Sequence, residues 1–418
     1  MIASLSKLTN TMDFIPKFFS PLSNFFTSLY IPSSRLEAEK SEEFLLQKSG
    51  LVLNNSHSPL SEKDVGSDFV VSKIFNLNLD DNNYLRTLHI KNNEEAINPN
   101  NVQKNTLVMT HGFGTALGFF FKNYKDLSEI KGIDLYSIDW LGMGLSSRPD
   151  FVIDKNLSTE ERVAKAEEFF VESLEQWRQK MGIEKMDLLG HSFGGYMSSV
   201  YALKYPERVN KLILESPMGL PETPENIESF LQTGTIPPKS STQSSTVNEK
   251  ADTRGSAILD RFRDASFTYR MLLKGSTLLW KHDYTPQGIL RMLGRFGPNI
   301  TKKYIGTFRT LNSEELLALS QYMYHISVQK GSGEYSMGIL LKPFAFAYVP
   351  LINRINNLTM PTYFLYGDRD WMDVKAGIMA CNSIRNYTQL NIISNAGHNM
   401  HLDNPTEFNR ILIDIINQ

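Results

Sequence analysis

Short apolar runs alternate along the chain with longer stretches in which apolar residues repeat at helical spacing. The runs at 106–110 and 133–138 have the length and composition of strands. Between 158 and 181 apolar residues recur every three or four positions, and Ser158 and Glu161 have the spacing of a helix-starting capping box. Further strands are predicted at 186–189, 211–215, 362–366 and 390–393. This alternation predicts an α/β fold with a mostly parallel sheet flanked by helices.

Two strand-like segments precede the alternation, at 69–75 and 84–90, and a turn-rich stretch between them predicts a hairpin. Ahead of the hairpin, residues 32–68 are polar and charged, which indicates a helix followed by a loop. Residues 1–31 carry six aromatic residues, two lysines and one acid. That composition is typical of a targeting segment or an interfacial anchor, or of a frayed end that packs its aromatic residues on the body.

The alternation is broken between residues 217 and 357. This region contains a stretch rich in Pro, Ser and Thr at 235–256, which we expect to be disordered, and aromatic-rich helical segments after it. We interpret 217–357 as a mainly helical cap inserted into an α/β core. The expected organisation is therefore a leader at 1–68, a first part of the core at 69–216, the cap, and a second part of the core at 358–418.

A G-x-S-x-G motif at 190–194 directly follows the predicted strand 186–189 and opens a helical stretch. In a strand–turn–helix setting this motif holds its serine in a strained conformation, with Oγ standing clear of the sheet. Glycines flank the serine because a Cβ there would collide with neighbouring backbone. We therefore predict Ser192 as a nucleophile; the alternative is a glycine-rich turn without a chemical role.

A serine hydroxyl is a weak nucleophile at neutral pH and needs a base that an acid orients. For a serine in this kind of turn, the chain order is Ser, then Asp or Glu, then His. His398 stands in a Gly-His turn after a late strand and is the predicted base. We choose Asp370 as the acid because it is the first position clear of the preceding glycine turn. Asp368 and Asp373 remain alternatives, and one of them is expected only to cap the next helix.

The turn His111–Gly114 follows the strand 106–110. Such a turn supplies one backbone N–H to a tetrahedral oxyanion, and the residue after the nucleophile supplies another. The predicted oxyanion donors are the amides of Phe113 and Phe193, and we expect both side chains to line an acyl pocket. The alternative is a tight turn with buried aromatic residues.

Composition mainly excludes other classes of protein. The net charge of −2 gives no basic field for nucleic acid, and no run of 18 apolar residues predicts a spanning helix. The single cysteine, Cys381, excludes an internal disulfide and a paired-cysteine zinc or redox site. His401 lies three residues beyond His398, but no third metal ligand is evident, so we predict no metal or other cofactor and a structural or surface role for His401.

The segments HGFGT, GHSFGGYMSSVYALKYPERV, DWLGMGLSSRP, YGDRDWMD and AGHNMHLDNP resemble the α/β-hydrolase-domain 4/5 subfamily. The similarity is greatest to its fungal branch, which includes a mitochondrial cardiolipin deacylase and lysophosphatidic acid acyltransferases. The resemblance spans about 69–418 and is weakest in the cap. It implies the α/β-hydrolase fold and a phospholipid or lysophospholipid substrate, with acyl-CoA as the donor if acyl groups are transferred.

The resemblance also implies a peripheral membrane enzyme of the mitochondrion, with the cytoplasm or lipid droplets as alternatives. The lack of any arginine before Arg35 counts against a mitochondrial presequence. The subfamily has an H-x-x-x-x-D motif linked to acyl transfer, which here runs from His398 to Asp403; alternatively, Asp403 caps the helix that begins at Pro405.

Some animal members of the subfamily have lost the serine and act as lipase co-activators. This chain keeps Ser192, so we expect an active serine hydrolase or acyltransferase that forms an acyl-enzyme. A soluble esterase for small esters is one alternative. A non-catalytic lipid-binding or lipase-regulating protein is the other.

Overall fold

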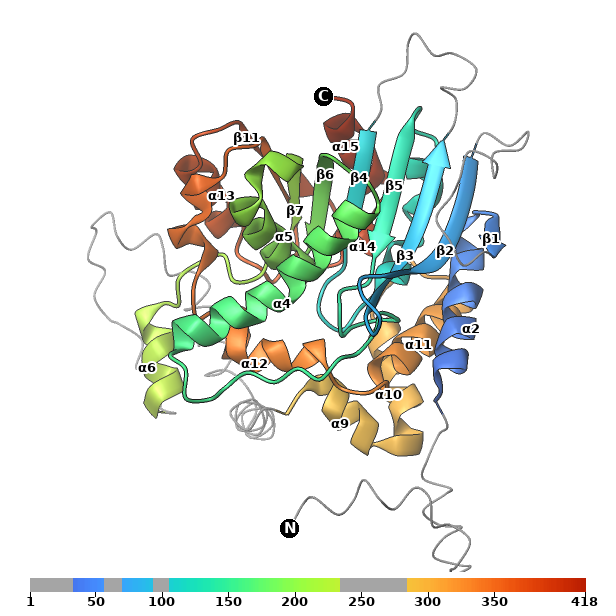
Figure 1. Ribbon diagram of the computed structural model, residues 1–418, viewed down its shortest axis with the longest axis horizontal. Helices are drawn as coiled ribbons and strands as arrows, with labels where there is room; N and C mark the ends of the chain where they lie inside the picture. Colours follow the sequence, from blue (N-terminus) through green and yellow to red (C-terminus); the bar gives the residue numbers. More distant parts are fainter. Residues whose placement is uncertain (1–32, 56–69, 93–104, 234–283) are drawn as a thin grey trace, which may run out of the picture.

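A computed structural model describes residues 33–55, 70–92, 105–233 and 284–418, and the fold below concerns these residues. Nine strands form one central sheet in the order β1-β2-β3-β5-β4-β6-β7-β10-β11 (Figure 1). Only the two pairings of β3, with β2 and with β5, are antiparallel. The strands are β1 (Leu53–Asn55), β2 (Val70–Asn78), β3 (Tyr84–Asn92), β4 (Asn105–Thr110), β5 (Ile133–Ile138), β6 (Met186–His191), β7 (Val209–Glu215), β10 (Thr362–Gly367) and β11 (Thr388–Ile393).

Helices cover both faces of this sheet and bury one apolar core on each. One face packs against α4 (Thr159–Lys180), α5 (Phe193–Lys204) and α13 (Val374–Ser383). The opposite face packs against the short α3 (Tyr124–Ser128) and α15 (Pro405–Ile416). Because both faces are covered, the central strands are apolar without alternation, as β6 shows with six buried residues in a row.

The predicted strands and the hairpin are confirmed. Strands β2 and β3 pair in antiparallel fashion from Val70 with Asn92 to Asn78 with Tyr84. The capping box at the start of α4 is also present, with the Ser158 side chain accepting from the Glu161 N–H and the Glu161 carboxylate accepting from the Ser158 N–H. These features were predictable because each depends on residues only a few positions apart.

Residues 33–55 pack on the body of the protein. Helix α2 (Arg35–Leu46) buries Ala38, Leu45 and Leu46, and it lies against α11 (Ser313–Ser327). On the same buried face Glu42 forms an ion pair with Arg86 of β3, at 2.6 Å between Oε2 and Nη2. The predicted helix in this region is thus present and is held by contacts that its polar composition did not indicate. Residues 1–32 lie outside the described residues.

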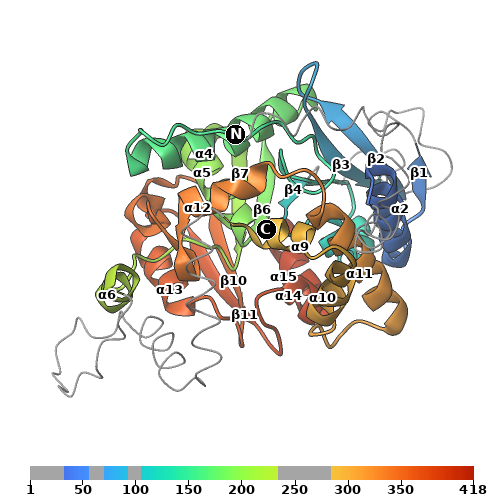
Figure 2. The same ribbon diagram turned by 90° about the horizontal axis from the view of Figure 1, so that it is seen from below.

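The remaining helices gather where the parallel strands end (Figures 1 and 2). Within 217–357 the described residues are mainly helical and add a two-stranded ribbon. The elements are α6 (Glu225–Thr233), α9 (Pro286–Met292), α10 (Gly297–Ile305), α11, α12 (Met337–Leu340), β8 (Leu341–Lys342) and β9 (Phe346–Ala347). The stretch 235–256 and the aromatic-rich segments up to 280 lie outside the described residues. In the described part of the chain no helix combines the length and hydropathy needed to cross a bilayer.

Candidate active site

Ser192 occupies a sharp turn between β6 and α5. Its backbone has φ 54° and ψ −108°, a region that residues with a side chain rarely adopt. The flanking glycines are required by space: a Cβ on Gly190 would lie 2.3 Å from the carbonyl oxygen of Gly194, and a Cβ on Gly194 would lie 2.5 Å from that of Thr110. The turn therefore holds the serine at the edge of the sheet, as the motif predicted.

The three residues predicted for nucleophile, base and acid lie in one hydrogen-bonded row. His398 Nε2 is 3.0 Å from Ser192 Oγ, and His398 Nδ1 is 3.2 Å from Asp370 Oδ1. The residues come from three strand ends, after β6, β10 and β11, which lie at the same edge of the parallel sheet. An imidazole held in this way can accept the proton of the serine hydroxyl.

The carboxylate of Asp370 is fully buried and well bonded. It accepts hydrogen bonds from the Ser216 hydroxyl and from the Met372 N–H. Burial acts to raise the pKa of Asp370, but the hydrogen bonds from His398, Ser216 and Met372 outweigh it and the pKa is lowered. An ionised Asp370 favours the tautomer of His398 with its proton on Nδ1, which leaves Nε2 free to accept from Ser192.

The two competing carboxylates bond elsewhere. Asp368 Oδ1 accepts from the Ala396 N–H at 3.0 Å, and Asp373 is the N-cap of α13, accepting from the Lys375 N–H at 2.9 Å. The structure thus places only Asp370, of the three carboxylates weighed from the sequence, on His398. Asp373 caps a helix, as expected for one of the alternatives.

The turn after β4 lies directly against the serine. A Cβ added to Gly112 would stand 3.3 Å from Ser192 Cβ, so the backbone that leads into Phe113 borders the nucleophile. The N–H of Phe193 is the first of α5 and belongs to the donors that a helix leaves without an intrahelical acceptor. Both predicted oxyanion donors therefore flank Ser192.

The side chain of Phe193 does not line the pocket, contrary to the sequence-based expectation. It is fully buried under the sheet edge and packs edge-on against Trp140 and Phe170, with ring centroids 6.2 and 5.0 Å away. Because Phe193 begins α5, its side chain points into the core beneath the turn while its N–H remains at the site. Phe113 does line the pocket.

A cavity of about 470 Å³ opens in front of Ser192 and His398. Its walls combine the loops at the strand ends with residues from 217–357 and are largely apolar, which suits an acyl chain. The residues lining it are Phe113, Ser192, Met218, Tyr304, Thr307, Phe308, Met337, Ala345, Trp371, Met372, His398, Asn399 and Asp403.

Asp403 lines this cavity, and its carboxylate accepts the Gly397 N–H at 2.8 Å. The helix α15 is capped by Asn404, whose side chain accepts from the Glu407 N–H. The alternative that Asp403 is merely the cap of this helix is therefore wrong. Asp403 instead steadies the loop that carries His398, from within the short helix α14 (Met400–Asp403).

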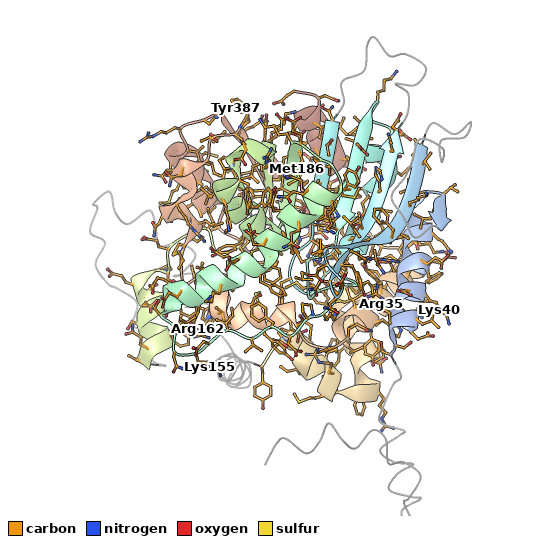
Figure 3. The ribbon with its side chains drawn as sticks, in the orientation of Figure 1. Arg35, Lys40, Lys155, Arg162, Met186 and Tyr387 are labelled. Atoms are coloured by element: carbon orange, nitrogen blue, oxygen red, sulfur yellow. The ribbon has the colours of Figure 1, made fainter. Side chains whose placement is uncertain are left out.

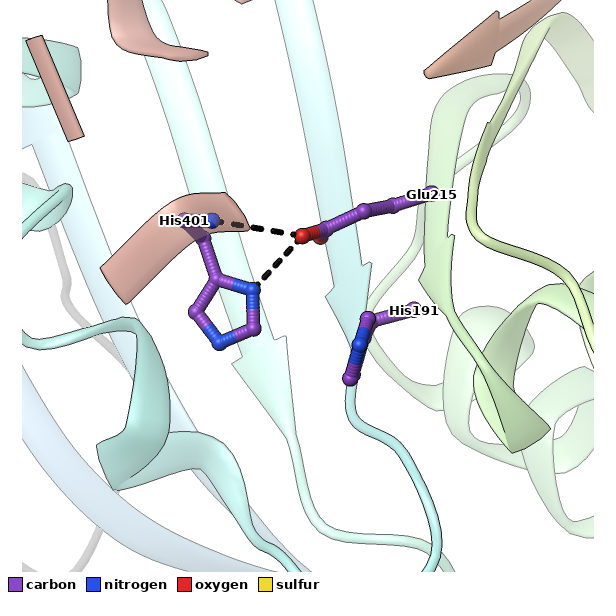
Figure 4. A group of neighbouring side chains, drawn as sticks. All are labelled: His191, Glu215 and His401. Atoms are coloured by element: carbon purple, nitrogen blue, oxygen red, sulfur yellow. Dashed lines mark hydrogen bonds and ion pairs between the residues drawn. The ribbon is translucent and has the colours of Figure 1, made fainter. Parts of the chain in front are cut away.

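Sequence reasoning missed a buried group of three polar side chains behind the site: His191, Glu215 and His401 (Figure 4). His401 Nδ1 donates to Glu215 Oε1 at 2.6 Å, and His191 Nε2 lies 3.0 Å from the carbonyl oxygen of His398. Burial raises the pKa of Glu215 to about 7, and burial lowers the pKa of His191 and of His401 to about 3. The one sequence signal was Glu215, which directly follows the apolar run Leu212–Leu214 of β7.

This buried group bears on two predictions made from the sequence: that no metal takes part, and that His401 is structural or at the surface. The three side chains offer ligand atoms within 4.8 Å of one another, but the His401 Nδ1 and the His191 Nε2 are engaged in the hydrogen bonds described above. His401 faces Glu215 rather than forming a pair with His398. It is buried, which agrees with a structural role, and the absence of a metal from the reaction stays a prediction.

Comparison with known proteins confirms the fold. Residues 105–405 match the family model described as "alpha/beta hydrolase fold", so the chain belongs to the α/β-hydrolase fold family. Two solved structures from Bacillus subtilis share the fold at 15% identity. They are a putative hydrolase (TM-score 0.53, 93% of this chain and 100% of that one) and carboxylesterase CesB (TM-score 0.52, 91% and 97%).

Three relatives, two of them named as acyltransferases and one as a lipase, indicate the type of enzyme within this family. The chain is 31% identical over 390 residues to a probable 1-acylglycerol-3-phosphate O-acyltransferase of Oryza sativa, covering 91% of this chain and 80% of the relative. It is 32% identical over 318 residues to human 1-acylglycerol-3-phosphate O-acyltransferase ABHD5, covering 75% and 77%. It is 30% identical over 327 residues to a mouse (lyso)-N-acylphosphatidylethanolamine lipase, covering 77% and 82%. The protein is therefore an enzyme of the hydrolase or acyltransferase type, with relatives of the ABHD4/5 kind.

Proposed function

We propose that the protein is a serine-dependent acyl hydrolase of phospholipids that works through an acyl-enzyme on Ser192. The observation that carries the proposal is the hydrogen-bonded row in which His398 joins Ser192 Oγ to the buried Asp370. No metal or organic cofactor takes part in this proposal.

The first half of the reaction transfers the acyl group to the serine. Ser192 Oγ attacks the ester carbonyl while His398 Nε2 takes the hydroxyl proton, and Asp370 stabilises the imidazolium through Nδ1–H. The amides of Phe113 and Phe193 hold the oxyanion. When the tetrahedral intermediate collapses, His398 returns its proton to the leaving alcohol.

The second half releases the acyl group. Water enters, His398 accepts one of its protons, and the fatty acid leaves with Ser192 regenerated. If the hydroxyl of a lysolipid enters instead of water, the same acyl-enzyme yields a transferred acyl chain. The choice depends on how far the cap excludes water from the cavity.

The proposed substrates are phospholipids or lysophospholipids, with cardiolipin as the first to test. Support comes from the largely apolar cavity and from relatives whose names specify acylglycerol phosphate and N-acylphosphatidylethanolamine. The resemblance to a fungal cardiolipin deacylase suggests the finer choice, and with it a mitochondrial, peripheral membrane location. Residues 1–32, which would carry an address, lie outside the described residues.

A second candidate function is acyl transfer from acyl-CoA to lysophosphatidic acid. The names of the rice and human relatives favour it, and so does Asp403, which lines the cavity beside His398 and completes the H-x-x-x-x-D spacing. In that reaction acyl-CoA supplies the acyl group to Ser192, and the lysolipid hydroxyl takes it.

Turnover of lipids by the wild type and by Ser192→Ala tests both candidates. The purified full chain is mixed with liposomes that contain cardiolipin, with and without lysophosphatidic acid and labelled acyl-CoA. Release of fatty acid by the wild type but not by Ser192→Ala supports hydrolysis. Label recovered mainly in phosphatidic acid, and lost in Ser192→Ala, supports transfer.

Two further outcomes would overturn the proposal. If both proteins are equally inert on every lipid and a fluorophosphonate fails to label the wild type, the non-catalytic alternative replaces it. If the wild type cleaves small soluble esters but no lipid in any form, the protein is a soluble esterase.

A further inference from the structure

An apolar stripe lies exposed on the outer side of α9 and α10. Four side chains recur at every fourth position, and 45 to 67% of each is exposed to solvent. Scattered exposed apolar residues are ordinary on protein surfaces, but Phe296, Ile300 and Tyr304 lie one helical turn apart along α10 and its N-cap, and Met292 at the end of α9 precedes them across the turn at Gly294. The residues of this stripe are Met292, Phe296, Ile300 and Tyr304.

The orientation of α10 is set by its opposite side. Gly297, Thr301 and Ile305 are buried, and a Cβ on Gly297 would stand 2.6 Å from the ring of Tyr324 on α11. This close approach locks α10 against α11. The apolar stripe is therefore left exposed, because the buried side of α10 packs against α11.

The surroundings of the stripe are basic. Residues 284–313 contain five Arg or Lys residues and no Asp or Glu. Arg291 pairs with the buried Glu334, whereas the other four are exposed and make no ion pair with any described residue. The four are Arg295, Lys302, Lys303 and Arg309.

The stripe leads to the active site. Tyr304 at its end lines the cavity that contains Ser192, and its ring packs edge-on against Phe308, which also lines that cavity, at 5.8 Å between centroids. Figures 1 and 2 show α9 and α10 on the side of the molecule where the parallel strands end. An occupant of this surface would therefore sit at the mouth of the cavity.

We propose that the outer face of α9 and α10 docks the protein on a bilayer containing anionic phospholipids. Exposed apolar side chains that insert among the headgroups, on a segment that also carries exposed cations, match the chemistry of an anionic interface. The proposal extends the proposed function, because docking here brings the cavity mouth to the lipid surface. A second copy of the chain fits less well, since the unpaired cations of two copies would face each other.

Vesicle co-sedimentation of the full chain tests this docking face. The vesicles are phosphatidylcholine alone, or phosphatidylcholine with 30 mol% phosphatidic acid. Each lysine near an anionic surface contributes a factor of about five to partitioning, so Lys302→Gln/Lys303→Gln should weaken binding to the anionic vesicles about 25-fold. Raising the salt concentration should reduce this difference. Phe296→Ser/Ile300→Ser should weaken binding to both kinds of vesicle by about tenfold or more.

Two matched control variants remove the same kinds of side chain, cationic or apolar, from surfaces outside α9 and α10. Lys375→Gln/Arg385→Gln removes two exposed cations near α13, and Val52→Ser/Tyr387→Ser removes two exposed apolar side chains. Tyr387 lies at the end of the molecule away from α9 and α10 (Figure 3). Both control variants should bind vesicles like the wild type.

The outcomes separate docking from catalysis. Ser192→Ala should bind vesicles normally, and both docking variants should cleave a short soluble ester at the wild-type rate. Docking variants that bind vesicles like the wild type, or no more weakly than their matched controls, overturn the docking proposal and leave the proposed function intact. A changed oligomeric state in sedimentation with unchanged vesicle binding would reassign the face to a second copy. A wild type that binds vesicles but cleaves no ester overturns the proposed function alone.

Discussion

The carboxylate of Glu215 accepts two hydrogen bonds from His401, from its Nδ1 at 2.6 Å and from its backbone N–H at 3.4 Å (Figure 4). This contact ties the end of β7 to the short helix that begins two residues after His398. The carbonyl oxygen of Glu215 also accepts the Ser192 N–H at 2.8 Å. One buried residue thus holds the segments that carry the nucleophile and the base.

Ser216, the residue after Glu215, also holds one of the segments that form the site. Ser216, with a φ of 44°, donates its hydroxyl to Asp370, so the carboxyl end of β7 contacts all three segments of the row. His191 completes the arrangement from β6 by bonding the carbonyl oxygen of His398. We infer that these residues position the site rather than react, because each acts through its contact with another residue.

The buried side chain of His401 should make the free energy of unfolding depend on pH in the acid range. Burial lowers the pKa of His401 from 6.5 to about 3. Between these two pH values His401 is therefore protonated in the unfolded chain but stays neutral in the native state. Stability is therefore lost as the pH falls from 6.5 toward 3. His401→Gln keeps an N–H for Glu215 and removes this loss. Between pH 7.5 and pH 4.5 the unfolding free energy of the wild type should fall relative to His401→Gln by about 3 kcal/mol, measured by urea titration. A difference that stays constant with pH would contradict this assignment.

Asp370 is expected to be the acid that orients His398. Asp370→Asn should lower kcat for ester hydrolysis about 10³- to 10⁴-fold with little change in KM, because the amide favours the wrong imidazole tautomer. Steady-state kinetics on a soluble ester would measure both constants.

The competing carboxylates serve as controls for this variant. Asp373→Asn keeps a residue that can cap α13, and Asp368→Asn alters only a loop contact, so both should stay within about fivefold of the wild type. A loss in Asp368→Asn as large as that in Asp370→Asn would mean that the acid has been misassigned.

The turn that bears Ser192 should tolerate no side chain at Gly194. A Cβ there meets the carbonyl oxygens of Thr110 and His111 at 2.5 and 2.8 Å, and backbone atoms cannot move aside cheaply. Gly194→Ala should lower the free energy of unfolding by about 3 kcal/mol or more. Gly306→Ala is the control, because Gly306 has a helical φ of −63° and a Cβ there would come no closer than 3.2 Å to its neighbours, so the loss of stability should be much smaller. Equal stability of the two variants would exclude the proposed collision.

Helix α2 should contribute to the stability of the whole fold. Arg86→Gln leaves the buried carboxyl of Glu42 without its cation, and removal of one partner of a buried pair typically costs 3 to 5 kcal/mol. Burial already raises the pKa of Glu42 to about 7, so the cost should be largest above pH 7, where the carboxyl is ionised. Chemical unfolding at pH 8 would measure it.

An exposed pair on the same helix is the control. Lys40→Gln breaks the contact of Lys40 with Glu37 and should cost less than about 0.5 kcal/mol. If Arg86→Gln costs no more than Lys40→Gln, then α2 is not held to the body through Glu42.

Local sequence patterns predicted the strands, the capping box at the start of α4 and the G-x-S-x-G turn. These features depend on contacts between residues close in the chain, and their spacing carries the information. The position of His398 after a late strand was predictable for the same reason, because parallel strands end at one edge of the sheet.

Tertiary packing selects Asp370 as the carboxylate that reaches His398, because Asp368, Asp370 and Asp373 stand close together in the sequence and only the folded loop gives them different partners. It also placed Glu215 beneath the site, turned the side chain of Phe193 into the core and packed α2 on the body. Each of these outcomes depends on side chains that meet across strands and helices far apart in sequence. Burial and distance between such residues are set by packing, and local residue patterns do not encode them.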